Sequence, residues 1–502
     1  MSLKRNILAN YIGQIYVTLI GIVLVPVYIK YMGAEAYGLV GFFAMLQAWF
    51  MMLDMGLTPA MSRETARFRG GAIDAASLRR LLRTLEGIFI VVGALGAIAI
   101  ITGAGYIATS WLKVRELPLS EVQQSIILMA LIIALRWVCG LYRSTIGGFE
   151  QIVWLNGISV IIATVRFALI IPFLIYVGAT PEKFFGYQLV VALVETLVFV
   201  TQAYRLMPVV DAGTPVSWEW QSLRSVLKFS FSIAFVSVVW VLITQTDKLI
   251  LSSLLPLSDY AAFTLAVLVA SGITLIGSPI SGALLPRMAR LNAEGDEAGL
   301  IRLYRNATQM VAVIVIPAAL VLALFAEQVL WAWTGNAEIA RKAAPVLALY
   351  AVGNGIMSLA AFPYYLQFAK GDLNLHMIGN AIFVVLFVPL LIWAAGKYGM
   401  EGAGYAWVTA NLVPFMVWLP VVHRRFVKGL HAQWLFRDVC LIVVLPVVMA
   451  YVALRSITWP EAQLLAAAYL VILCIGLCMT AAVSSSWVRE MLWHKWLAAP
   501  SR

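Results

Sequence analysis

Charged residues occur in short segments of this chain, and runs of about 20 apolar residues separate these segments. A helix of that length crosses the roughly 30 Å hydrocarbon layer of a bilayer and satisfies its own backbone hydrogen bonds. The pattern therefore predicts an all-α polytopic membrane protein with about fourteen transmembrane helices. The predicted spans are 8–30, 37–58, 87–111, 122–142, 153–177, 184–204, 229–254, 260–285, 308–333, 344–368, 375–396, 402–422, 439–454 and 462–483.

Composition and charge agree with a membrane protein and add an orientation. The chain is 62% hydrophobic and 12% charged, with a mean hydropathy of +0.92, which is too apolar for a soluble protein of this size. Twenty-four of the lysines and arginines fall in segments on one predicted side and eight on the other. The positive-inside rule then places both termini in the cytoplasm. The net charge of +11 reflects topology and contact with anionic lipid, so we expect no nucleic-acid partner.

Several sequence matches recur at a nearly constant separation and indicate an internal duplication. The matches are Tyr37 with Tyr260, Pro172 with Pro389, Tyr187 with Tyr405, and LRRLLR at 78–83 with LIRLYR at 300–305, at separations of 217 to 223 residues. A unit of six helices returns the chain to the side where it began, so the second copy enters the membrane in the same orientation. We therefore expect two parallel, pseudo-symmetric six-helix lobes with a cavity between them.

The duplication also predicts the domain boundaries. The first lobe covers 1–222, the second covers 223–428, and two accessory C-terminal helices with a cytoplasmic tail occupy 429–502. The repeated basic segments 78–83 and 300–305 are amphipathic, and we expect them to be helices that lie at the membrane interface. In the first of them and just after it, Leu81, Leu82 and Leu85 would face lipid or protein.

Arg136, Arg166 and Glu195 are three of the four charged residues that lie well inside predicted spans of the first lobe. The fourth is Asp54, near the cytoplasmic end of its span. A guanidinium at the bilayer centre costs roughly 2.5 to 3.5 kcal/mol on insertion scales, so each arginine needs a partner, a wet cavity or a substrate. The planar fork of arginine makes bidentate contacts with phosphate oxygens, which predicts an anion site at Arg136 and Arg166. The alternative is a packed ion pair with Glu195. The two readings are balanced for Arg166, whereas Arg136 favours the anion site because it has no obvious carboxylate nearby.

The repeat makes these charges specific to the first lobe. Arg166 corresponds to Phe383 and Glu195 to Val413, so the duplicated scaffold itself does not require them. This difference predicts an asymmetric cavity whose anion site belongs to the first lobe.

Asp247 and Lys248 form a second charged position, on the seventh predicted span. Adjacent residues point about 100 degrees apart on a helix, so we expect each to find another partner. Lys248 is a third candidate for anion binding, and Asp247 joins Glu195 as a candidate for coupling to H+ or Na+. A structural ion pair between the lobes is the alternative.

Aromatic residues offer a way to bind sugar rings, and Trp137, Tyr364 and Tyr365 are the candidates for stacking. An aromatic belt at the membrane interface is the alternative for the tyrosines. The sequence has no Walker A, HExxH or GxSxG motif, and its four histidines are scattered. We therefore expect no catalytic residues, no metal site, no cofactor and no enzymatic activity.

Two stretches carry a family resemblance. The N-terminal ANYIGQIYVTLIGIVLVPVYIKYMGAEAYGLVGFF, followed by LDMGLTPAMSRETAR, resembles the start of Wzx-type O-antigen and polysaccharide flippases. These flippases belong to the multidrug/oligosaccharidyl-lipid/polysaccharide (MOP) exporter superfamily. The stretch TDKLILSSLLPLSDYAAF resembles the same family at its seventh helix.

The resemblance implies a flippase that moves an undecaprenyl-pyrophosphate-linked oligosaccharide across a bacterial inner membrane by alternating access. It also implies a cationic lumen, coupling to an ion gradient, and partners that include membrane lipids and the polymerase and chain-length proteins of the same pathway. The alternatives are a multidrug-type exporter of small molecules and a flippase for a peptidoglycan lipid precursor. A membrane glycosyltransferase or ligase is a further alternative from another class.

Overall fold

The computed structural model describes residues 3–210 and 218–490 of the chain. The described residues are 89% helical, and they contain no β-strand beyond one isolated bridge between Lys113 and Pro256. The predicted cytoplasmic tail beyond residue 490 lies outside the described residues. The predicted all-α membrane fold is confirmed.

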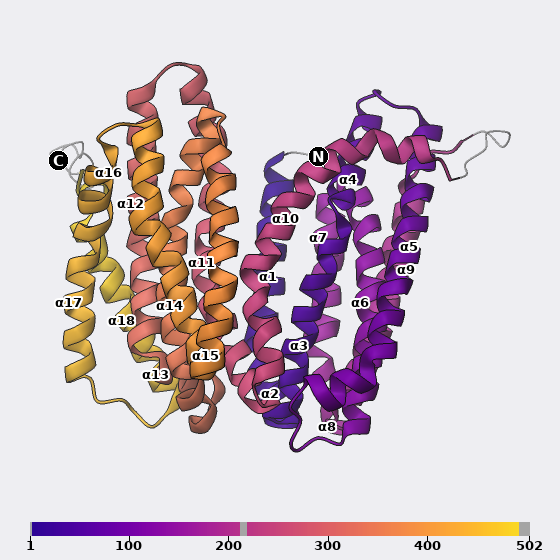
Figure 1. Cartoon of the computed structure of the whole chain (residues 1–502), viewed down its shortest axis with the longest axis horizontal. Coiled ribbons are helices and arrows are strands. Elements are labelled where there is room, and N and C mark those ends of the chain that lie inside the picture. The colour runs from indigo at the N-terminus through magenta and orange to yellow at the C-terminus, as the bar shows by residue number, and fades with distance from the viewer. Residues whose placement is uncertain (1–2, 211–217, 491–502) are drawn as a thin grey trace, which may run out of the picture. The chain divides into compact units, whose positions relative to one another are not determined.

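Contacts between Cα atoms divide the chain into two compact units, Met1–Ala261 and Ala262–Arg502 (Figure 1). The helices of the first unit are α1 (Leu3–Val23), α2 (Val25–Met32), α3 (Ala34–Phe50), η1 (Met51–Asp54), α4 (Leu57–Arg69), α5 (Ala75–Tyr106), η2 (Ile107–Trp111), α6 (Leu119–Gly148), α7 (Ile152–Ala163), η3 (Thr164–Ala168), α8 (Ile170–Tyr176), α9 (Pro181–Leu206) and α10 (Trp220–Leu254). Helix α10 packs against α3, α4 and α5, which places it in this unit. The boundaries at residues 222 and 428 are based on the sequence repeat and stay predictions.

The second unit begins within α11 (Leu257–Ala293). Its other helices are α12 (Glu297–Leu324), α13 (Ala326–Thr334), α14 (Ala337–Lys370), α15 (Asn374–Phe426), α16 (Leu430–Gln433), η4 (Trp434–Cys440), α17 (Leu441–Ser456) and α18 (Gln463–Ser484). Its hydrophobic core includes the buried side chains of Tyr304, Phe362 and Trp434.

Thirteen helical segments of the described residues are long and apolar enough to cross a membrane. The number differs from fourteen because α15 runs for 53 residues and contains two of the predicted spans. Its two halves meet at Gly399, whose φ of 59° and ψ of −135° are not helical. Glycine tolerates this left-handed backbone because it has no Cβ.

The repeated basic segments differ from the prediction. Residues 78–83 and 300–305 are not separate helices at the interface but early turns of the long helices α5 and α12. Both helices start at an equivalent aspartate: the Asp74 carboxylate accepts a hydrogen bond from the Ser77 N–H, and the Asp296 carboxylate accepts one from the Gly299 N–H. Leu81, Leu82 and Leu85 are buried against protein because α4, α6 and α10 cover this part of α5.

The accessory C-terminal helices are anchored to α12 through buried polar groups, and α12 lies beside α17 and α18 (Figure 1). Asp438 is fully buried and accepts hydrogen bonds from Arg305 at 2.7 and 3.1 Å. Gln309 donates to the same carboxylate at 2.7 Å, and its own carbonyl accepts hydrogen bonds from Ser485 and from the Trp487 N–H. This network joins α12, η4 and the end of α18.

Candidate functional site

The packing of α6 against α9, with η3 beside them, gathers the charged residues of the first unit. Arg136 and Arg143 lie on α6, Arg166 lies on η3, and Glu195 lies on α9. The two arginines of α6 are seven residues apart, which is about two helical turns, so they share one face of the helix. We call Arg136, Arg143, Arg166 and Glu195 the arginine cluster.

Glu195 is the common partner of the three arginines. Its carboxylate is hydrogen-bonded to Arg166, lies 3.5 Å from Nη1 of Arg143, and lies 4.0 Å from Nε of Arg136. Its side chain is 8% exposed, while those of Arg136 and Arg166 are 11% and 18% exposed. The cluster therefore holds three cations for one carboxylate in a largely buried position.

Two glutamines complete the surroundings of Arg136. Its Nη2 donates to Oε1 of Gln188 at 3.0 Å, and its Nη1 donates to Oε1 of Gln47 at 3.3 Å. The guanidinium also lies 5.4 Å from the ring centre of Phe43. The Nε atoms of Arg136 and Arg166 are buried and have no hydrogen-bond partner in the described part of the chain. Buried donors of this kind are normally satisfied, so they are available to an acceptor that enters the site.

The backbone around Arg166 is a π-helix, Thr164–Ala168, in which the Leu169 N–H bonds to the carbonyl of Thr164. A π-turn interrupts the regular pattern of backbone hydrogen bonds in the helix. Here three successive backbone carbonyls accept hydrogen bonds from side chains of other helices. Tyr187 donates to Val165, Gln188 donates to Arg166, and Tyr28 donates to Phe167, at 2.7, 3.2 and 2.6 Å. These bonds fix the turn that directs Arg166 toward Glu195. π-turns are frequent at functional sites.

The sequence left two readings of Arg166 open, and the ion pair with Glu195 is present. For Arg136 the expectation of no nearby carboxylate is wrong, because Glu195 lies 4.0 Å from its Nε. The distance from Arg136 to Glu195 is 59 residues in sequence, and only the packing of α6 on α9 brings them together. Because one carboxylate serves three arginines, the ion pair and an anion site are compatible here.

Asp247 and Lys248 were expected to find other partners and not to pair with one another; Lys248 does find another partner, but the two side chains also form an ion pair. The ammonium of Lys248 lies 3.7 Å from the carboxylate of Asp247 and donates to the carbonyl of Thr244 at 2.5 Å. The long side chain of Lys248 folds back along the helix by one turn. Its ammonium can therefore approach Asp247, although the two side chains leave the helix in different directions. Within the described residues, Lys248 makes no ion pair with Glu195, so it is separate from the arginine cluster.

The three aromatic candidates for sugar stacking lie in different units of the chain. Trp137 is buried, stacks on Phe89 with ring centres 4.3 Å apart, and contacts Phe50 edge-on, so both neighbours already cover its ring. Tyr364 and Tyr365 lie on α14 in the second unit, where Tyr364 packs on His376 at 4.5 Å.

Sequence reasoning missed Arg143, Gln47 and Gln188. Arg143 was counted as a topology charge, although its spacing of seven residues from Arg136 indicates a shared face. The two glutamines lie in apolar stretches of predicted spans, and an amide inside a span is a signal for a buried polar partner.

Two units of long apolar helices define a polytopic membrane protein. The chain belongs to the polysaccharide biosynthesis protein family, whose sequence pattern matches residues 3–292, and the MatE pattern matches residues 232–393. The resemblance to flippases of the MOP superfamily is thereby confirmed. A relative named "Putative O-antigen transporter" from Shigella flexneri is 21% identical over 441 residues, which cover 88% of this chain and 99% of that protein.

Solved structures share the fold. The lipid II flippase MurJ in an inward closed conformation superposes with a TM-score of 0.72 at 13% identity, covering 96% of this chain and 99% of that chain. An inward-facing multidrug resistance MATE transporter superposes with a TM-score of 0.67 at 16% identity, covering 83% of this chain and 96% of that chain. The chain is thus a multi-pass membrane protein with the transporter fold of this superfamily.

Proposed function

We propose that this chain moves an undecaprenyl-pyrophosphate-linked oligosaccharide across a bacterial inner membrane by alternating access. The observation that carries the proposal is the arginine cluster, where three guanidiniums share the single carboxylate of Glu195. The similarity to the Shigella flexneri O-antigen transporter supports a lipid-linked glycan as the substrate. In this proposal the prenyl chain stays in the lipid while the sugar crosses through a wet lumen.

The pyrophosphate would bind to the cluster by replacing Glu195 as the partner of the arginines. Guanidinium groups contact phosphate oxygens in a bidentate manner, and charge-assisted bonds of this kind are stronger than neutral ones. The Nε atoms of Arg136 and Arg166 make no hydrogen bond within the described residues, so they can donate to the pyrophosphate oxygens. Gln188 and Gln47 hold the guanidinium of Arg136 in place from its other edge.

Transport would be coupled to H+ or Na+ through Glu195, with Asp247 as the second candidate. A proton on Glu195 would remove its charge and release the arginines for the substrate, so substrate binding and protonation would favour each other. In this proposal both termini are cytoplasmic. The partners are membrane lipids and the polymerase and chain-length proteins of the pathway, and the chain forms no new covalent bond.

The fold neighbours define the competing functions. A flippase for a peptidoglycan lipid precursor would carry the same pyrophosphate chemistry, and the fold that the chain shares with MurJ is compatible with this alternative. A multidrug-type exporter of cations would instead require Glu195 or Asp247 and would tolerate loss of the arginines. A glycosyltransferase or ligase would make glycosidic bonds with purified protein.

The experiment is transbilayer movement of a lipid-linked oligosaccharide in liposomes that contain the purified protein. The double variant Arg136→Gln/Arg166→Gln removes two charge-assisted contacts, each worth about 1.5 to 3 kcal/mol. We expect the initial rate to fall by at least about tenfold. A parallel assay with lipid II compares the two pyrophosphate-linked substrates.

The matched control is Arg290→Gln/Arg341→Gln, which removes two exposed arginines and should leave the rate unchanged. An unchanged rate in the Arg136→Gln/Arg166→Gln variant would exclude the anion site. Loss of transport in Glu195→Gln together with full activity of the double arginine variant would favour the cation exporter.

A further inference from the structure

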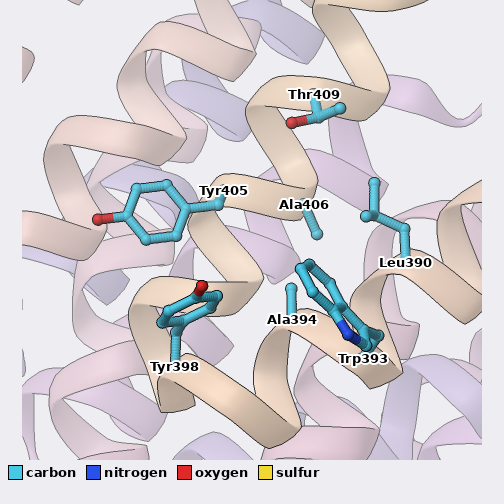
Figure 2. Close-up of a pocket in the computed structure, with 7 residues that line it drawn as sticks. All are labelled: Leu390, Trp393, Ala394, Tyr398, Tyr405, Ala406 and Thr409. Carbon is cyan, nitrogen blue, oxygen red and sulfur yellow. The ribbon is translucent and has the colours of Figure 1, made fainter.

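A cavity of about 430 Å³ opens in the hairpin where the two halves of α15 meet (Figure 2). Trp393 approaches it from the first half, Tyr405 and Thr409 lie on the second half, and Tyr398 lies at the bend beside Gly399. The volume falls in the range of sites for small molecules, which usually combine aromatic walls with a few polar groups.

Three aromatic rings form a row along this cavity. Tyr398 contacts Trp393 and Tyr405 edge-on, with ring centres 6.2 and 6.1 Å apart. The side chains of the three residues are half exposed. The ammonium of Lys397 lies 5.6 Å from the ring centre of Trp393 and 5.2 Å from that of Tyr398, an attraction that restrains both rings. The rings therefore offer a restrained and accessible apolar surface.

The same residues carry polar groups that the protein leaves without partners. Among the described residues, no hydrogen bond involves the indole N–H of Trp393, the hydroxyls of Tyr398 and Tyr405, or the hydroxyl of Thr409. A threonine in a helix commonly bonds to the carbonyl four residues earlier, as Thr145 does here. The hydroxyl of Thr409 is not used in this way, so it remains available to a ligand.

A ligand of this cavity must cover aromatic rings and also form hydrogen bonds with free hydroxyls. This requirement separates a lipid chain from a sugar. A lipid chain would cover the rings and leave the polar groups without partners, which costs free energy where water is excluded. A pyranose ring has a C–H face that covers an aromatic ring and hydroxyls that both donate and accept hydrogen bonds. We propose that this hairpin cavity is a pyranose-binding subsite for the glycan of the transported substrate.

The inference rests on the proposed function and deepens it. In the topology predicted from the charges, Lys397 lies on the outer side of the membrane, where the glycan would emerge. The subsite belongs to the second unit, and the arginine cluster belongs to the first. Sugar and pyrophosphate would thus be recognised by different parts of the chain.

The test is saturation-transfer NMR on the full-length protein in nanodiscs, with methyl β-D-glucopyranoside, methyl β-D-galactopyranoside, methyl α-L-rhamnopyranoside and methyl N-acetyl-β-D-glucosaminide as probes. We expect transfer to at least one glycoside. Trp393→Ala and Tyr398→Ala should weaken its binding by about two- to tenfold, in line with the strength of aromatic contacts. Thr409→Val replaces the hydroxyl with a methyl group of similar size and should weaken binding while the shape of the cavity is kept.

Tyr176→Ala is the matched control. Tyr176 is highly exposed near the end of α8, and the sequence repeat pairs it with Trp393, but it does not line this cavity. Binding should be unchanged in this variant. Absence of transfer to all four glycosides, or an equal loss in Tyr176→Ala, would overturn the proposal and assign Trp393 to an ordinary aromatic belt.

The liposome assay separates this inference from the proposed function. Glycoside binding that depends on Trp393, without any movement of lipid-linked oligosaccharide, would reject the flippase and retain the subsite. Movement of the oligosaccharide with an unchanged rate in Trp393→Ala and no glycoside binding would reject the subsite and retain the flippase.

Discussion

At the scale of single residues, Glu195 decides the electrostatics of the arginine cluster. Its carboxylate contacts Arg166 directly and lies within 4.0 Å of Arg136 and 3.5 Å of Arg143. The interaction of opposite charges at such distances reaches a few kcal/mol when they are partly shielded from water. Glu195 therefore both stabilises the arginines in the folded chain and competes with any anion that enters.

Glu195→Gln should raise the affinity for inorganic pyrophosphate by about tenfold or more, because the competing charge is gone. The measurement is isothermal titration calorimetry on the purified protein. The same variant should unfold at a lower temperature, since it leaves three guanidiniums without a carboxylate. The double variant Arg143→Gln/Glu195→Gln returns the net charge of the arginine cluster to its original value and should recover part of the lost stability.

The control is Glu327→Gln, which neutralises a half-exposed carboxylate 3.8 Å from Arg341 in the second unit. It should change neither pyrophosphate binding nor stability noticeably. If Glu195→Gln binds pyrophosphate more weakly, Glu195 positions the arginines for the anion and does not compete with it.

At the scale of elements, α15 depends on two glycines, one for its backbone conformation and one for a close approach. Gly399 turns the backbone between the two halves, and a Cβ on Gly402 would lie 2.0 Å from the carbonyl oxygen of Ala394. Gly396, in the same hairpin, has no atom within 4 Å of its Cβ position. The halves can pack tightly because the contact falls at Gly402.

Gly402→Ala should therefore destabilise the protein by about 1 to 3 kcal/mol, because the backbone of Ala394 cannot move aside cheaply. Gly396→Ala should have the opposite effect and stabilise the protein by about 0.5 to 1 kcal/mol, since alanine is the better helix former. Thermal unfolding of the purified variants in detergent measures both. Equal effects of the two substitutions would contradict the close approach at Gly402.

At the scale of the whole molecule, a few buried polar groups join the accessory helices to the rest of the second unit. Arg305 and Gln309 on α12 meet Asp438 from η4, which lies 133 and 129 residues away in sequence. The apolar faces of α17 and α18 resemble those of any membrane helix, so apolar packing alone does not determine which helix they pack against. The polar network determines where they contact α12.

Asp438→Asn should lower stability by about 3 kcal/mol, because it removes one partner of a buried ion pair. It should also make the chain between α15 and α18 more sensitive to limited proteolysis. Glu297 on the same helix α12 forms an exposed pair with Lys370 of α14, and Glu297→Gln, which removes this pair, should cost less than about 1 kcal/mol. Similar losses in the two variants would show that burial of Asp438 is not decisive.

The class of the protein and its predicted spans followed from the sequence alone. An apolar run long enough to cross a bilayer must form a helix that satisfies its own backbone, and this requirement is local. The merged helix α15 does not change this result, because its two halves correspond to two predicted spans. Two stretches of sequence also indicated the family resemblance, and the match over residues 3–292, which includes both, confirms it.

Only the tertiary structure decided which charges meet. Whether two side chains touch depends on the rotation and depth of each helix, and an apolar pattern leaves both undetermined. The π-turn at Thr164–Ala168 changes the rotation of Arg166, and the packing of α6 on α9 adds Arg143 and Gln188 to its surroundings. Residues separated by tens of positions thus became one cluster, because helix packing, and not sequence distance, sets the distance between buried charges.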